Sequence, residues 1–421
     1  MTTIHAYTFV NTANLEILLK EHFNDFRRHD INITAKYAVR DFIRDRFVEY
    51  GLDVSMHEFA TRKPEFTGSN VIGILNGQKA MTSDDKIVLL GSHYDTADTT
   101  PGVDDNGSGM ALLLETARVV TSHCNPEYTI IFVAFDYAEF TVSWADDPCY
   151  WNVPCGSQRF VEDWLVSFLQ DRDSPEFQGA FIADTLMNWD DNNNTQDLPG
   201  AFNVLFTDTY TRIRDNGFRG DFLFVYSRPE DATLMETFAS HYNSQDGSAY
   251  RIECLLLPIT GQPTTYQERF YTNQLRSDHH NFWRNSNSFK AVQLTDSANF
   301  RGYMQSCHHR LCDDVNPITP EIIQFLAKTT KAIVATLLEM SATPSYCPDG
   351  RGNPPSTISL RSSKEPTTLE APKQSTKTTE LQQISKPARV TNTARTMTFN
   401  TIVICIHTSA SIAIYFVYTE R

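Results

Sequence analysis

The chain has 421 residues, of which 41% are hydrophobic and 21% charged, and this composition supports a packed core and argues against global disorder. It carries 36 Lys and Arg against 51 Asp and Glu, which gives a formal net charge of −15. This charge argues against nucleic acid as the main partner, because phosphate binding needs Lys and Arg. An acidic body instead suits cationic ligands or metal ions.

Short apolar runs alternate with helical segments along most of the chain. The first 60 residues show the periodicity of two amphipathic helices, and Gly51 is expected to end the second one. The expected strands are 53–59, 70–75, 86–90, 128–135, 180–187 and 291–294, and the later helices are 108–122, 160–169 and 322–338. Strands that are apolar throughout indicate a sheet buried on both faces. We therefore predict an α/β fold, a three-layer sandwich whose mostly parallel central sheet is covered by helices on both faces.

The composition changes after the predicted α/β domain, which spans residues 1–340. Residues 341–398 contain 19 Ser or Thr and seven Pro, so we expect a disordered stalk. Residues 399–421 include an apolar stretch at 400–418, close to the ~20 residues that cross a bilayer. We expect this segment to be a membrane anchor, either a single span or the cleaved signal for a glycolipid anchor. Burial of the segment within the fold is the alternative.

Cysteines and glycosylation motifs favour the cell surface or the secretory pathway. Two cysteine pairs are close enough in sequence for short disulfide loops, Cys149 with Cys155 and Cys307 with Cys312. Acceptor motifs for N-glycosylation begin at Asn32, Asn193 and Asn106, and the last of these lies in an expected site loop. No signal peptide is visible between Met1 and Val10, so either a leader is missing or the route is different.

Acidic and imidazole side chains recur near the ends of the expected strands and in a late loop. They are His93, Asp104, Glu139, Asp184 and His309. Taken singly, each has an ordinary explanation as turn or helix-cap chemistry. Gathered at one edge of a sheet, two histidines and three carboxylates form a mixed donor set suited to zinc, with manganese or cobalt as substitutes. Asp95 is placed to orient the imidazole of His93.

The motifs around these residues resemble metallopeptidase family 28, the group of bacterial leucyl-type aminopeptidases and animal glutaminyl cyclases. The motifs read HYDT at 93–96, PGVDDNGSG at 101–109, FVAFDYAE at 132–139 and SDHHNFW at 277–283. The resemblance runs from about residue 35 to residue 340.

The resemblance implies a site with two zinc ions. His93 and Asp184 would hold one ion, Glu139 and His309 the other, and Asp104 would bridge them, while Asp95 would support His93. His308 competes with His309, which is preferred because the family places an acid four residues after this ligand, as Asp313 is here. The segment Ser277-Asp278-His279 matches a family segment near the site and would have at most a supporting role.

One position departs from the family pattern. Active members carry two consecutive Glu after the third strand of the motif set, the first as general base and the second as ligand. An ungapped alignment puts Ala138 at the base position and Glu139 at the ligand position. A slip of one residue would make Glu139 the base and leave Phe140, which cannot bind a metal, at the ligand position. Asp136 is a further candidate base, and the extra loop 141–155 would either cap the pocket or be a disulfide-pinned surface loop.

These features leave several functions open. We expect a membrane-tethered, zinc-binding metallopeptidase homologue that removes N-terminal residues from peptides. Its activity is expected to be weakened, because Ala138 stands at the position of the general base. The alternative is a catalytically inactive, metal-retaining binding or adhesion ectodomain with an unknown protein ligand. Glutaminyl cyclisation ranks last, because it also relies on an acidic residue at the position of Ala138.

Overall fold

The computed structural model describes residues 9–344, except for 64, 98, 124, 140–154 and 246, all within one compact unit of the chain. Its strands form a single eight-stranded sheet in the order β1-β2-β4-β3-β5-β8-β6-β7. The strands are β1 Asp53–Ala60, β2 Thr67–Leu75, β3 Lys86–His93, β4 Ile130–Phe135, β5 Glu176–Ala183, β6 Phe222–Ser227, β7 Arg251–Leu256 and β8 Ala291–Thr295.

Longer and shorter helical segments connect these strands. The helices are α1 Thr12–Ile17, α2 Ile33–Glu49, α3 Gly109–Thr121, α4 Cys155–Arg159, α5 Val166–Gln170, α6 Phe202–Leu205, α7 Thr207–Asp215, α8 Ala232–Ser244, α9 Thr265–Phe270, α10 His279–Arg284, α11 Met304–Cys307 and α12 Pro320–Met340. The shorter segments are η2 Leu18–His22, η3 Val103–Ser108, η4 Phe160–Leu165, η5 Pro229–Asp231, η6 Thr272–Gln274 and η7 Ala298–Phe300.

The sheet is mixed, with a parallel centre. Strand β3 runs parallel to β4 and β5, β5 runs parallel to β8, and β6 runs parallel to β7. The pairs β1–β2, β2–β4 and β6–β8 are antiparallel. Because β4, β3, β5 and β8 all point the same way, their carboxyl ends meet at one edge, where ligands bind in folds of this kind.

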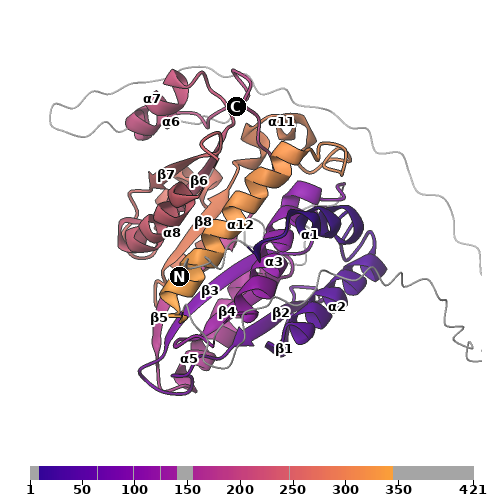
Figure 1. Cartoon of the computed structure of the whole chain (residues 1–421), viewed down its shortest axis with the longest axis vertical. Coiled ribbons are helices and arrows are strands. Elements are labelled where there is room, and N and C mark those ends of the chain that lie inside the picture. The colour runs from indigo at the N-terminus through magenta and orange to yellow at the C-terminus, as the bar shows by residue number, and fades with distance from the viewer. Residues whose placement is uncertain are drawn as a thin grey trace, which may run out of the picture. The chain divides into compact units, whose positions relative to one another are not determined.

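Two apolar layers hold the sheet between helices, as the sequence predicts. Along β3, Val88 and Leu90 belong to the core under α3, α8 and α12, whereas Ile87 and Leu89 belong to the core under η4 and α10. Figure 1 shows α12 and α3 side by side over one face of the sheet. The expected α/β sandwich is confirmed.

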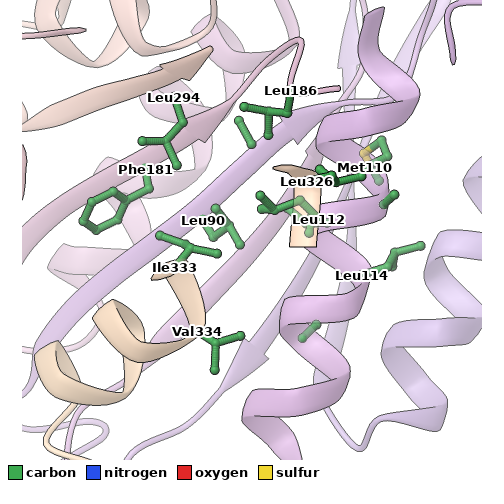
Figure 2. Packing of buried hydrophobic residues seen from close by; sticks show 14 of the residues in the cluster. Leu90, Met110, Leu112, Leu114, Phe181, Leu186, Leu294, Leu326, Ile333 and Val334 are labelled. Atoms are coloured by element: carbon green, nitrogen blue, oxygen red, sulfur yellow. The ribbon is translucent and has the colours of Figure 1, made fainter. Parts of the chain in front are cut away.

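The core beneath α3 and α12 fixes the strands whose ends carry the site. Figure 2 shows Leu90 and Phe181 of the sheet near Leu112 of α3 and Ile333 of α12. All four side chains are fully buried. Burying a side chain of this size contributes roughly 1.5–3 kcal/mol, so the central strands form a rigid support for the loops at their carboxyl ends.

Two regions of the sheet differ from the sequence expectation. Strand β5 ends at Ala183 and does not continue to Met187, because Thr185 adopts a left-handed backbone with φ of 54°. Strands β6 and β7 are not among the strands predicted from the sequence. Both form the far end of the sheet, where β7 pairs only with β6 among the described strands.

The expected disulfide between Cys307 and Cys312 is present. Cys149 lies outside the described residues. Asn106 is fully buried, which removes it as a glycosylation acceptor, whereas Asn193 lies in an exposed loop. Glycosylation at Asn193 or at Asn32 stays a prediction.

The body continues slightly past the predicted domain end. Helix α12 ends at Met340, and the buried Ser341 still accepts hydrogen bonds at its carbonyl oxygen from the N–H groups of Glu127 and Tyr128. Among residues 9–344, outside the gaps, no helix is long and apolar enough to cross a membrane. The anchor predicted at 399–421, most of the stalk and most of the extra loop lie outside the described residues.

Candidate functional site

Three predicted donors come together at the carboxyl edge of the sheet. His93 ends β3, Asp184 directly follows β5, and Glu139 lies four residues beyond the end of β4. The Nε2 atom of His93 lies 3.7 Å from Asp184 Oδ1 and 3.9 Å from Glu139 Oε1. Parallel strands therefore bring together side chains that are up to 91 positions apart in the chain, as expected for strand ends at one edge.

The aspartate between the two histidine-bearing segments is Asp105. Its Oδ1 atom lies 3.5 Å from His93 Nε2. Its Oδ2 atom lies 3.2 Å from His308 Nε2 and 3.1 Å from His309 Nε2. The two oxygens of one carboxylate thus face two different groups of donors, which is the arrangement that a bridging ligand requires.

The expectation that Asp104 is the bridging residue is therefore corrected by one position. Asp104 Oδ1 accepts hydrogen bonds from the N–H groups of Leu186 at 3.1 Å and Met187 at 3.0 Å. Asp104 is fully buried, and burial together with the negative charge of Asp296 raises its pKa well above the usual range. It supports the loop that follows β5 and does not join the donor cluster.

Both histidines of the late loop reach the cluster. Their rings stack with centroids 3.8 Å apart, within the loop that the Cys307–Cys312 disulfide closes. His309 Nε2 also lies 3.2 Å from Glu139 Oε2, so His309 contacts both Asp105 and Glu139. The preferred His309 and its competitor His308 thus both reach the cluster.

Asp95 occupies the supporting position that the sequence suggests. His93 Nδ1 lies 3.2 Å from the backbone oxygen of Asp95 and 3.5 Å from its Oδ1 atom. The same carboxylate accepts the N–H groups of Ala138 at 3.1 Å and Glu139 at 3.0 Å. One buried side chain therefore aligns the His93 ring and holds the segment that carries Glu139.

The contacts of Glu139 favour the ungapped alignment. Glu139 reaches both His93 and His309, as a ligand would, while Ala138 offers no group that can accept a proton. Asp136 does not fill this gap. Its carboxylate is buried, lies 2.6 Å from Lys36 Nζ and accepts the N–H of Ser69 at 3.0 Å. Asp136 is thus a structural partner of Lys36.

Two further residues, Asp313 and Arg27, hold the loops of the site, and the sequence motifs point only to Asp313. Asp313 accepts the N–H groups of Asp104 at 2.7 Å and Asp105 at 3.1 Å. The guanidinium of Arg27 is buried and donates to the backbone oxygens of Tyr94, Pro101 and Gly102. Arg27 lies in an irregular segment without a recognisable pattern, so only its position in the fold identifies it.

Asp278 is a buried acid in the segment that the resemblance marks as supporting. Ser157 Oγ donates to Asp278 Oδ1 at 2.5 Å. Burial raises the pKa of Asp278 to about 7, and the negative charges of Asp184 and Asp95 act in the same direction. Asp278 therefore belongs to the electrostatic surroundings of the cluster.

The charge balance of the cluster calls for cations. Burial alone would lower the pKa of His93, but contacts with Asp105, Asp184 and Asp95 outweigh it and raise that pKa well above the usual range. The acids Asp105, Glu139 and Asp184 have side chains only 4%, 12% and 15% exposed. Carboxylates and imidazoles gathered in this way are the mixed oxygen and nitrogen set that zinc takes.

The sheet and the cluster at its carboxyl edge define an α/β fold of the zinc aminopeptidase type. Residues 70–185, which include His93, Asp105, Glu139 and Asp184, match the model of peptidase family M28. The structure of LapB from Legionella pneumophila superimposes with a TM-score of 0.52 over 80% of this chain and 74% of that chain. At 16% sequence identity, this similarity concerns the fold alone.

Two curated relatives match parts of the chain. The uncharacterized protein YfbL of Escherichia coli (strain K12) is 25% identical over 228 residues, which cover 52% of this chain and 58% of YfbL. The aminopeptidase YwaD of Bacillus subtilis (strain 168) is 40% identical over 73 residues, which cover 17% of this chain and 15% of YwaD. The chain thus spans less than two thirds of the length of either relative.

Proposed function

We propose that this domain binds two zinc ions. His93 and Asp184 hold one ion, Glu139 and His309 hold the other, and Asp105 bridges them. The observation that carries this proposal is the position of Asp105, whose two oxygens face separate donor groups. Zinc at such a site supplies Lewis acidity and lowers the pKa of a bound water molecule.

The proposed substrates are peptides with a free N-terminus. A terminal amine is a cation, and three nearly buried carboxylates surround the histidines at this edge of the sheet. The name of YwaD points the same way, since that relative is an aminopeptidase. Glutaminyl cyclisation is less well supported, because Ala138 stands where an acidic residue would be needed.

Hydrolysis by this chain is proposed to be slow. A positioned general base contributes roughly 10²–10⁴-fold to rate, and Ala138 cannot act as one. Asp136 is bound to Lys36 and Ser69, so it does not replace the missing carboxylate. The same observations favour a second candidate function, a metal-retaining domain that binds peptides or another protein ligand without cleaving them.

Metal analysis combined with peptidase assays tests the proposal. We expect close to two zinc ions per chain and slow release of the N-terminal residue from short peptides. N-acetylated peptides of the same sequence are the matched control and should not be cleaved, because they lack the terminal cation. Absence of stoichiometric metal under zinc-replete conditions would refute the metal site. Two bound zinc ions without cleavage would instead favour the binding function.

We further propose that residues 341–398 form a stalk and 399–421 a membrane anchor at the cell surface. The support is compositional, namely the Ser, Thr and Pro content of the first segment and the apolar run of the second. Deleting 399–421 should release the protein from membranes into the soluble fraction. Continued sedimentation of the truncated chain with membranes would rule out this anchor. Release of the full chain by phosphatidylinositol-specific phospholipase would identify the glycolipid version.

A further inference from the structure

The loop closed by the Cys307–Cys312 disulfide carries two histidines whose side chains reach the cluster. The zinc site proposed above includes only one of them, His309. His308 Nε2 and His309 Nε2 lie 3.2 and 3.1 Å from the same atom, Asp105 Oδ2. The donor atoms of these three residues all lie within 4.8 Å of one another. The Nε2 atoms of His308 and His309 therefore lie at nearly the same distance from Asp105.

These separations fit direct hydrogen bonds in a metal-free site and also fit ligands that share an ion. Zinc binds imidazole nitrogen at about 2.0–2.1 Å and carboxylate oxygen at about 2.0–2.2 Å in a tetrahedron, which places neighbouring ligand atoms roughly 3.3 Å apart. The Asp105–His308 and Asp105–His309 distances match this spacing, as does the 3.2 Å between His309 Nε2 and Glu139 Oε2.

The backbone of the loop explains why two consecutive side chains point to one place. His308 has φ of −55° and ψ of 125°, and His309 has φ of 57°, while the N–H of Arg310 donates to the oxygen of Cys307 at 2.9 Å. These values describe a type II turn with His309 at the position that favours glycine. A histidine there has an unfavourable backbone, by about 1–3 kcal/mol, yet it brings both rings to Asp105.

We infer that His308 is a metal ligand together with His309, Asp105 and Glu139, so that four protein donors surround one ion. This inference rests on the proposed zinc site. Structural zinc sites are closed by four protein ligands, whereas catalytic sites keep one position open. His308 thus fills the fourth position of this ion, whereas the ion held by His93, Asp184 and Asp105 keeps an open position.

Metal affinity and the spectrum of cobalt-substituted protein test the role of His308. In His308→Ala, we expect the affinity of one of the two zinc ions to fall at least tenfold in competition with a chelator. We also expect the cobalt spectrum to change from four-coordinate towards higher coordination as solvent enters. Free imidazole should restore the wild-type spectrum, because it supplies the missing donor. His241→Ala, which removes a histidine paired with Glu339 outside the cluster, is the control and should match wild type.

The outcomes separate this inference from the zinc proposal. If wild-type protein binds two zinc ions and His308→Ala keeps the same affinities and cobalt spectrum, His308 is not a ligand and the proposed site stands without it. If wild-type protein binds no zinc, the proposed function fails and the inference fails with it. His309→Ala provides the reference for the loss of one ligand from this ion.

Discussion

Asp104 and Asp105 are neighbours in one loop, but their carboxylates serve different parts of the site. Asp104 accepts the backbone N–H groups of Leu186 and Met187, whereas Asp105 lies between His93 and the pair His308 and His309. The first aspartate therefore organises a loop, and the second faces the donors of the cluster.

Because the two carboxylates have different contacts, the same Asp→Asn substitution should have different effects at the two positions. Asp105→Asn should weaken binding of both zinc ions, because the amide keeps the shape of the side chain but loses its charge and one of its two oxygen donors. Asp104→Asn should keep the zinc stoichiometry, since its Oδ1 can still accept the two backbone N–H groups. Zinc content after exhaustive dialysis measures both effects. Loss of zinc only in Asp104→Asn would restore Asp104 as the bridging residue.

Asp95→Asn should lower zinc affinity by about 10–100-fold without removing a ligand. The present carboxylate accepts the N–H groups of Ala138 and Glu139 with separate oxygens, and an amide can accept only one of them. Isothermal titration with zinc provides the measurement, and circular dichroism establishes that the fold persists. Unchanged affinity in a folded variant would show that Asp95 does not position Glu139 or His93.

Reduction of the Cys307–Cys312 disulfide should also weaken metal binding. The bridge closes the loop that presents His308 and His309, so opening it increases the conformational entropy that binding must overcome. The double substitution Cys307→Ser and Cys312→Ser should raise the zinc Kd by about tenfold, equivalent to ~1.4 kcal/mol. Cys254→Ser, at a free cysteine on β7, is the control. Equal affinities in all three proteins would argue against a role of the disulfide.

Restoring the missing general base should raise the rate of peptide hydrolysis only when the metal ion is accessible to water and substrate. Ala138→Glu alone is expected to raise kcat for an N-terminal peptide substrate little, because His308 still closes the ion. In the His308→Ala background, the same change should raise kcat by about 10² or more, the usual worth of a general base. KM should change less, since the base acts mainly in the transition state. A large gain from Ala138→Glu alone would contradict closure by His308.

The raised pKa of Asp278 predicts how the free energy of unfolding depends on pH. Burial raises its pKa to about 7, against an unfolded value of about 3.9. Between these values the folded protein binds more protons than the unfolded chain, so this residue makes the free energy of unfolding fall as pH rises.

Asp278→Asn should remove this fall and stabilise metal-free protein at pH 7.5 by up to roughly 4 kcal/mol relative to pH 4. Its amide oxygen can still accept the hydrogen bond from Ser157. Urea denaturation at both pH values in the presence of chelator provides the measurement, and Asp215→Asn at the exposed end of α7 is the control. Parallel pH dependence in Asp278→Asn and wild type would contradict a buried, neutral carboxyl group.

The sequence predicts the parallel centre of the sheet and most of the donor cluster, because both depend on short-range patterns. Apolar runs mark the strands, and His93, Glu139 and Asp184 each lie within four residues of a strand end. His93, Glu139 and Asp184 could be selected in this way. The sequence alone does not decide whether Asp104 or Asp105 faces the cluster. The orientation of each side chain depends on hydrogen bonds of the loop to Asp313 and to the loop after β5.

Other parts of the site depend on contacts between distant segments. Arg27 acts through backbone oxygens of residues 94–102, and such contacts leave no trace in the spacing of residue types. The sequence favours His309 over His308 because the family places an acid four residues after this ligand, and that spacing does not show that both side chains reach the cluster. The left-handed backbone of His309 brings both rings to Asp105.

The buried ion pair between Lys36 and Asp136 has a consequence for the choice of recombinant fragments. Residues 70–185 match the family, yet Lys36 of α2 supplies the positive partner of Asp136 and packs its Nζ atom 3.6 Å from the centre of the Tyr137 ring. A fragment that begins after α2 would leave a carboxylate uncompensated in the interior, a loss of about 3–5 kcal/mol. A usable expression boundary therefore lies ahead of Ile33, where α2 begins.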